Sequence, residues 1–326
     1  EIVLRMVKHA MQHTGMKNLC LAGGVALNCV ANGKLLREKI TENLYIQPAA
    51  GDAGGALGAA LAGYHIFHGK TREPVLPDSM KGAFLGPSYD PQYIRAVLRR
   101  ARAPFTHYPG FNDLVHRVAG LIAEGKVVGW FQGRMEYGPR ALGNRSILGD
   151  SRNEEMQKKL NLKIKYRESF RPFAPAIPEE EARAFFELNV PSPYMLLVAP
   201  VKKERRRKLP ENYFQLPPME RLYVQRSDVP AITHIDFSAR IQTESRETNK
   251  RFWTLIRAFR EQTGYASLIN TSFNVRGEPI VNTPEEAYRC FMNTGMDVLV
   301  LENFLLLKGE QPEWQQDDYT RTLKPD

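Results

Sequence analysis

Positively charged side chains between Arg134 and Arg171 are the residues of this chain that could most clearly do chemistry. Many of them lie in or after the stretch from Tyr137 to Ser146, which contains two glycines and one proline. Glycine lets backbone N–H groups approach a ligand closely, and guanidinium groups beside such N–H groups suit phosphate and carboxylate recognition. We therefore predict that this stretch binds the anionic part of a phosphorylated substrate.

Not every cation in the stretch is a candidate for that site. Glu154 and Glu155 precede Lys158 and Lys159 by four residues, a spacing typical of ion pairs on a solvated helix surface. Removing them leaves a core of three candidates and two second choices, in that order: Arg140, Lys165 and Arg171, then Arg145 and Arg167.

The segment from Lys165 to Arg171 alternates charged or hydroxyl side chains with others. On an extended backbone Lys165, Arg167, Ser169 and Arg171 would point to one side. Such a face is costly unless an anion or water covers it. An anion site and an exposed edge strand are both compatible with this pattern.

Length and composition limit the possible classes of protein. At 326 residues the chain is long enough for about two domains, and no apolar run approaches the length of a membrane span. The three cysteines form neither a metal-ligand spacing nor a disulfide framework, and we interpret Cys20 and Cys290 as buried thiols in a reducing cytoplasm. The chain begins without Met or a signal peptide, which we interpret as the C-terminal piece of a longer protein.

The net charge of +9 admits an anionic partner, including nucleic acid. The most basic run, residues 202–208, has no interleaved aromatic residues, so a solvated loop is favoured over a nucleic-acid patch. A histidine pair at His9 and His13 could ligate a metal on a helix, but no acidic residue nearby completes a site. We favour a solvated helix face for this pair.

Residues 1–72 alternate strand and helix patterns, with a glycine turn after each strand. Gly23 and Gly24 follow the apolar strand at 19–22, and a second turn at 51–55 follows the strand at 44–46. Asp52 lies in the second turn, where a carboxylate is either a helix N-cap or a ligand for a metal or ribose.

These turns resemble a known family. Residues 21–28 and 51–55 are similar to the second half of the actin-like ATPase (ASKHA, RNase H-like) domain of NodU/CmcH-type O-carbamoyltransferases. The resemblance implies a purine nucleotide over Gly23 and Gly24, with Asn28 in the same motif. It also implies that Asp52 binds Fe2+ or a similar metal, whose other ligands are a histidine pair in the first half of that domain.

The rest of the chain reads as a second α/β domain at residues 84–310, after a proline-containing linker at 73–83. Apolar runs predict strands at 127–131, 194–198, 232–241, 296–301 and 304–307. A helix is predicted at 247–263, and Thr283 with Glu286 predicts a capping box. The tail at 311–326 shows no such pattern and is predicted to be frayed.

This second part resembles the YrdC-like domain of the same carbamoyltransferases. The resemblance is carried by six residues, with Tyr137–Ser146 and 170–175 as its most specific stretches: Arg140, Lys165, Arg171, Arg240, Ser272 and Asn274. In the family these positions bind carbamoyl phosphate and ATP, with Mg2+. At Phe237 the family pattern has a glycine, so the backbone path before Arg240 is expected to differ.

The sequence therefore predicts a mixed α/β protein, with a partial ASKHA domain followed by a twisted, open YrdC-like sheet. The resemblance implies an ATP-dependent O-carbamoyltransferase that forms carbamoyladenylate and acts on a small hydroxyl acceptor such as an antibiotic, sugar or nodulation factor. It implies no nucleic-acid or membrane partner, and a homodimer is possible. Two alternatives are a threonylcarbamoyladenylate synthase of tRNA modification and a non-catalytic RNA-binding module.

Overall fold

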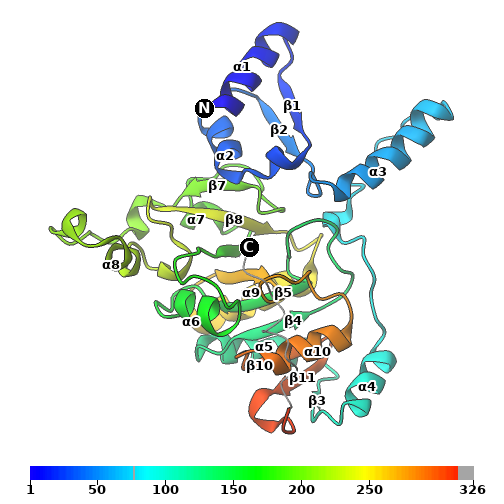
Figure 1. Ribbon diagram of the computed structural model, residues 1–326, viewed down its shortest axis with the longest axis vertical. Coiled ribbons are helices and arrows are strands. Elements are labelled where there is room, and N and C mark those ends of the chain that lie inside the picture. Colours follow the sequence, from blue (N-terminus) through cyan, green and yellow to red (C-terminus); the bar gives the residue numbers. More distant parts are fainter. Residues whose placement is uncertain (76–77, 315–326) are drawn as a thin grey trace.

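A computed structural model describes residues 1–75 and 78–314, which form a small α/β unit and a large one (Figure 1). The strands are β1 Asn18–Leu21, β2 Asn43–Ile46, β3 Thr106–His107, β4 Val128–Phe131, β5 Arg145–Asp150, β6 Ala174–Pro178, β7 Leu197–Pro200, β8 Ser238–Glu244, β9 Leu268–Ser272, β10 Val298–Leu301 and β11 Phe304–Leu307. The α-helices are α1 Ile2–Thr14, α2 Cys29–Arg37, α3 Ala53–Ala62, α4 Pro91–Arg100, α5 Phe111–Ala123, α6 Met156–Lys163, α7 Ala182–Phe185, α8 Pro218–Tyr223, α9 Lys250–Thr263 and α10 Pro284–Asn293. The predicted mixed α/β class is confirmed.

The large unit is built on one mixed sheet with the strand order β3-β11-β10-β4-β5-β9-β6-β8-β7. The β10/β4 and β6/β8 pairs are parallel, and the other neighbouring pairs are antiparallel. The strand β9 lies between β5 and β6 in the interior of this order, so its end is flanked by strands on both sides.

Strands at the centre of the large sheet are buried on both faces. Along β10, Val298 and Val300 pack with α5 and α9, whereas Leu299 and Leu301 face the cluster that contains α4 and α10. Successive strand residues point to opposite faces, so an uninterrupted apolar run indicates helices on both sides. The unbroken run at 298–301 thus explains the three-layer arrangement.

The small unit is a parallel pair, β1 and β2, with α1 and α2 packed beside it. It joins the large unit through α2, whose Asn32 and Arg37 donate hydrogen bonds of 3.1 and 2.7 Å to the carbonyl oxygens of Leu196 and Val198. A Cβ at Gly33 would lie 2.1 Å from the Val198 oxygen, so only glycine permits this contact. The contact places the N-terminus of α2 beside the large sheet.

Helix α3 projects from the body of the molecule, and none of its residues is buried (Figure 1). The β1 strand is likewise only half covered, and Cys20 is exposed. The predicted burial of Cys20 is therefore wrong, because helices of the described chain cover only part of this two-stranded sheet. Burial of Cys290, on α10, is confirmed.

Local signals for helix ends were strong in the sequence, and the structure confirms them. Gly15 and Gly264 end α1 and α9 with positive φ angles of 66° and 78°. The Thr283–Glu286 capping box is present, with hydrogen bonds in both directions. These signals are reliable because they depend on neighbours in the sequence alone.

Two strand predictions near the candidate site are wrong. Residues 164–171 form turns after α6, and Tyr166 has a φ of 47°, which breaks the expected alternation. The strand predicted from residue 232 begins only at Ser238, because Phe237 has a φ of 62°. A left-handed conformation favours glycine, and here Phe237 adopts it while its ring packs under Arg206. Whether this backbone path differs from that of the family stays a prediction.

The boundaries predicted at 72/73 and 83/84 stay predictions. Asp78 accepts a 2.8 Å hydrogen bond from Tyr194, so the end of the predicted linker lies on the large unit. Within the predicted tail, Trp314 donates to Asn293, and residues 315–326 lie outside the described residues. No helix in the described part of the chain is long and apolar enough to span a bilayer.

Candidate functional site

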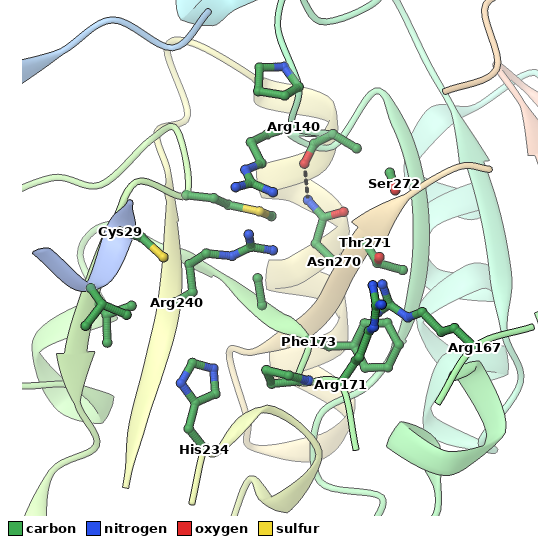
Figure 2. A pocket seen from close by; sticks show the side chains of 17 residues that line it. Cys29, Arg140, Arg167, Arg171, Phe173, His234, Arg240, Asn270, Thr271 and Ser272 are labelled. Atoms are coloured by element: carbon green, nitrogen blue, oxygen red, sulfur yellow. Dashed lines mark hydrogen bonds between the residues drawn. The ribbon is translucent and has the colours of Figure 1, made fainter. Parts of the chain in front are cut away.

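A cavity of about 510 Å³ opens where the small unit meets the large sheet (Figure 2). Four arginines line it, from three separate segments: Arg140 from the β4–β5 loop, Arg167 and Arg171 from the loop before β6, and Arg240 from β8. Among the residues that the structure describes, no Asp or Glu lines the cavity. The cavity is therefore strongly positive, and its volume is in the usual range for small-molecule sites.

Arg140 and Arg240 carry the largest unbalanced charge in this cavity. In the described chain neither guanidinium has a hydrogen bond or ion pair, and Arg140 Nε is buried without a partner. Burial, followed by the charge of Arg140, lowers the pKa of Arg240 to about 10, and burial also lowers the pKa of Arg140. Both remain charged at neutral pH, so the pair calls for an anion between them.

Arg167 and Arg171, in contrast, have partners within the protein. Arg167 donates from Nε to Asn161 at 2.8 Å, and its guanidinium lies 5.1 Å from the centre of the Phe173 ring. Arg171 is exposed and pairs with Glu168 at 3.0 Å. Figure 2 shows both arginines on the side of the cavity across from Arg140 and Arg240. The predicted core residue Arg171 and the second choice Arg167 thus lie together.

The loop that carries Arg140 is wrapped around a buried carboxylate. One oxygen of Glu136, Oε1, accepts hydrogen bonds from the backbone N–H groups of Leu142, Asn144 and Arg145 at 2.6, 2.8 and 3.2 Å. Burial raises the pKa of this carboxyl. The other second choice, Arg145, is fully buried, donates to backbone carbonyls and lies 3.5 Å from the centre of the Phe131 ring. Arg145 therefore supports the loop and does not line the cavity.

We expect Glu136→Ala to lower the free energy of unfolding by about 3 kcal/mol, because three buried N–H groups lose their acceptor. Phosphate binding should weaken with it, since the loop no longer positions Arg140. Urea denaturation and calorimetric titration with inorganic phosphate measure the two effects. Glu136→Gln keeps a carbonyl oxygen at this position and is the matched control. Wild-type values for Glu136→Ala would contradict the role of Glu136 in the loop.

Lys165 lies behind the cavity wall. It is 3% exposed, and its ammonium group donates to the backbone carbonyl and side-chain oxygens of both Ser272 and Asn274. Burial, followed by the charge of Arg167, lowers the pKa of Lys165 to about 7. Ser272 lines the cavity, and its hydroxyl is 2.7 Å from Asn274 Oδ1. The structure thus brings these three predicted residues together, and their roles toward a substrate stay predictions.

Several lining residues were not among the predicted site residues. Cys29 reaches the cavity from the start of α2, and Asn270 and Thr271 come from β9. His234 lines the cavity as well, with Nδ1 3.1 Å from Ser238 Oγ, and burial lowers its pKa. Asn270 could have been found, because it continues the alternation of Ser272 and Asn274 one step back along the strand.

The residues predicted from the first resemblance lie outside this cavity. Gly23 has a φ of 93°, and a Cβ at Gly23 or Gly24 would meet open space. Asn28 caps α2 by accepting from Ala31 at 3.1 Å, and Asp52 precedes α3 without a side-chain capping bond. Their nucleotide and metal roles stay predictions.

Metal binding has little support in the donor set of the described residues. They contain no group of three or more His, Cys, Asp or Glu side chains arranged to hold an ion. Asp52 supplies a single carboxylate, and no carboxylate lines the arginine cavity. The residues present therefore do not by themselves fit the Fe2+ or Mg2+ site that the resemblance implies.

Two of the six cations in the basic run at 202–208 are paired within the protein. Arg205 pairs with Asp228 at 2.6 Å and lies 3.6 Å from the centre of the Phe185 ring. Arg206 lies 3.5 Å from Glu187. The charges of Lys203, Arg207 and Lys208 are exposed, so the preference for a solvated loop over a nucleic-acid patch stays a prediction.

Comparison with protein families matches two models along the chain. Residues 1–61 match the carbamoyltransferase N-terminus, and residues 119–308 match the carbamoyltransferase C-terminus. The chain is 56% identical over 319 residues to the uncharacterized protein sll1178 of Synechocystis, covering 97% of this chain and 52% of that protein. It is 41% identical over 312 residues to the nodulation protein NolNO of Sinorhizobium fredii, covering 94% and 42%.

The chain thus spans about half the length of the curated relatives it matches. Among solved structures, full-length HypF in its phosphate- and nucleotide-bound form is similar over 61% of this chain and 22% of that one, with 18% identity and a TM-score of 0.37. The family assignment depends on the two models, the second of which alone covers more than half of the chain. On this evidence the chain belongs to the carbamoyltransferase family.

Proposed function

We propose that this chain is the carbamoyl-activating part of an ATP-dependent O-carbamoyltransferase. Carbamoyl phosphate and ATP bind in the arginine cavity, and the activated carbamoyl group passes to a hydroxyl of a small acceptor, such as an antibiotic, sugar or nodulation factor. Family membership supports carbamoyl transfer, and the nodulation proteins among the relatives support the last of these acceptor classes.

One observation carries this proposal. Arg140 and Arg240 face a cavity that no carboxylate of the described chain lines, and neither arginine has a hydrogen-bond or ion-pair partner there. Two partly buried guanidiniums on one side of a cavity are unfavourable unless an anion offsets their charge. Phosphate esters and acyl phosphates supply such an anion, and arginine binds them through two parallel hydrogen bonds.

The chemistry proceeds in three steps. Water cleaves carbamoyl phosphate to carbamate and inorganic phosphate. A carbamate oxygen then attacks the α-phosphorus of ATP, and pyrophosphate leaves as carbamoyladenylate forms. Finally the acceptor hydroxyl attacks the carbamoyl carbon, AMP leaves, and the hydroxyl proton is released.

No protein nucleophile is needed in these steps. Negative charge builds on phosphoryl oxygens in the first two, and fixed guanidinium groups stabilise it without reorganising. Arg140 and Arg240 would hold the phosphoryl oxygens, while Arg167, Arg171 and the Ser272 hydroxyl complete the donor set from the opposite wall. The chain contributes position and charge.

The Asp52 region would belong to the transfer step. Asp52 would contribute one carboxylate ligand to a metal there, and the further ligands would have to come from outside the described residues. A threonylcarbamoyladenylate synthase would share the cavity chemistry, but the match to both carbamoyltransferase models favours transfer to a hydroxyl.

The test is pyrophosphate release from ATP by the purified chain, measured with and without carbamoyl phosphate. We expect release only when both substrates are present, with inorganic phosphate formed in equal amount and carbamoyladenylate detectable by mass spectrometry. Release of ADP in place of pyrophosphate, or no binding of carbamoyl phosphate, would reject the proposal. Tight RNA binding with a steep salt dependence would instead support the RNA-binding alternative.

A further inference from the structure

Asn270 brings an amide carbonyl oxygen to the wall of a cavity that four arginines line. It lies on β9, is 0% exposed, and is the one lining side chain that contains a carbonyl oxygen. Its Oδ1 is buried without a hydrogen-bond partner in the described protein. In Figure 2 the Asn270 side chain lies between the Arg140–Arg240 pair and Arg167. A buried acceptor left unpaired is unfavourable unless a ligand supplies a donor.

Neighbouring groups fix which end of the Asn270 amide faces which way. Nδ2 donates to the carbonyl oxygen of Ala141 at 3.3 Å and to Gln242 Oε1 at 2.6 Å. A backbone carbonyl can only accept, so the nitrogen must face Ala141. The second contact agrees, because the Gln242 amide nitrogen donates to the carboxylate of Glu244, which turns the Gln242 oxygen toward Asn270. Oδ1 is thereby held on the remaining side.

We propose that Asn270 Oδ1 accepts a hydrogen bond from the NH2 group of the carbamoyl moiety, so that Asn270 selects carbamoyl phosphate over other acyl phosphates. This inference depends on the proposed function. The arginines recognise the phosphate, which all acyl phosphates share. Acetyl phosphate has nearly the same shape, but a methyl group replaces the amine and cannot pair with Oδ1.

A site that pairs a buried polar group with the ligand rejects analogues that lack the partner, because the protein group then stays unsatisfied. Arginine cavities by themselves would bind carbamoyl and acetyl phosphate about equally. Asn270 therefore acts as a specificity-determining residue. Ala141 ties it to the loop that carries Arg140, so the acceptor and the phosphate-binding guanidinium keep a fixed relative position.

Calorimetric titrations with carbamoyl phosphate, acetyl phosphate and inorganic phosphate test the proposal. The wild-type chain should bind carbamoyl phosphate at least about 10-fold more tightly than acetyl phosphate. Asn270→Leu should bring the two affinities within about 3-fold of each other, through weaker carbamoyl phosphate binding. Its affinity for inorganic phosphate should stay within about 3-fold of wild type, which shows that the arginines remain in place.

A wild-type affinity ratio near one would overturn the proposal without any variant. So would an Asn270→Leu chain that binds phosphate normally and still prefers carbamoyl phosphate. If Asn270→Leu does not fold or loses phosphate binding, Asn270→Ser, which keeps a small polar group, is measured in the same way, and an unchanged ratio overturns the proposal. Failure of the wild-type chain to bind any of the three phosphates would reject the proposed function itself.

Discussion

Arg240→Ala is expected to lower carbamoyl-phosphate-dependent pyrophosphate release by about 10²–10³-fold, the usual cost of removing one fixed donor from a developing oxyanion. Arg240 combines burial, closeness to Arg140 and the lack of any partner in the described chain. Arg240 is the one Lys or Arg of β8, and Arg167 and Arg171 lie across the cavity from it, so neither can take its place.

The same substitution should leave the unliganded protein at least as stable as wild type. The lowered pKa of Arg240 reflects a charge that burial and Arg140 make unfavourable in the folded chain. Removing it relieves this cost, so the melting temperature should be unchanged or raised while activity falls. Substitution of a residue that only supports the fold would lower both the melting temperature and the activity.

Arg134→Ala is the matched control for this pair of measurements. Arg134 lies in the β4–β5 loop that carries Arg140, is exposed, and donates to the carbonyl oxygen of Leu85 outside the cavity. It should keep wild-type release and nearly wild-type stability. Pyrophosphate release by Arg240→Ala within a few-fold of wild type would remove Arg240 from the site.

Lys165→Met should reduce both activity and stability. The amino group of Lys165 lies within hydrogen-bond distance of four oxygens of Ser272 and Asn274. In Lys165→Met the Ser272 carbonyl keeps its hydrogen bond from the Asn274 N–H, whereas the Asn274 carbonyl loses the lysine as a donor. We expect a loss of about 1 kcal/mol in the free energy of unfolding, which is the cost of the lost acceptor contacts less the gain from removing a buried charge. Pyrophosphate release should fall because Ser272 is no longer held in the cavity wall.

The pH dependence of this stability loss has a definite sign. In the folded chain the pKa of Lys165 is lowered to about 7, below the value of an unfolded lysine near 10.5. Between these values the unfolded chain binds a proton that the folded chain does not, so wild-type stability rises with pH. The difference between wild type and Lys165→Met should therefore grow from pH 7 to pH 9, by up to about 1.4 kcal/mol per pH unit. Urea denaturation at both pH values measures it, and a difference that shrinks would contradict the assignment.

Sequence reasoning named some of the residues that line the cavity. Arg140, Arg171, Arg240 and Ser272, which the family resemblance singled out, line it although they come from four separate segments. Their role in binding a substrate stays a prediction. The sequence could not distinguish arginines that support the fold from arginines that line the cavity within one stretch. Arg145 and Arg167 were equal second choices, and only packing shows Arg145 over Phe131 and Arg167 at the cavity.

Backbone conformation was the second feature of the site that the sequence could not predict. The alternation of Lys165, Arg167 and Arg171 predicted one shared face, but the positive φ at Tyr166 turns Lys165 inward and leaves the arginines at the cavity. A positive φ at a non-glycine residue is set by tertiary contacts, and no local pattern announces it.

The sequence by itself determined the α/β class, the helix ends and the cationic residue types at the candidate site, because apolar periodicity, capping residues and residue types act locally. The tertiary structure decided which charges go unpaired. Within the described residues, Arg140 and Arg240 have no hydrogen-bond or ion-pair partner and Asn270 Oδ1 has no donor, because distant segments bring these groups together without a counter-group. Pairing is a property of three-dimensional neighbours, and it is what turns a cationic stretch into a binding site.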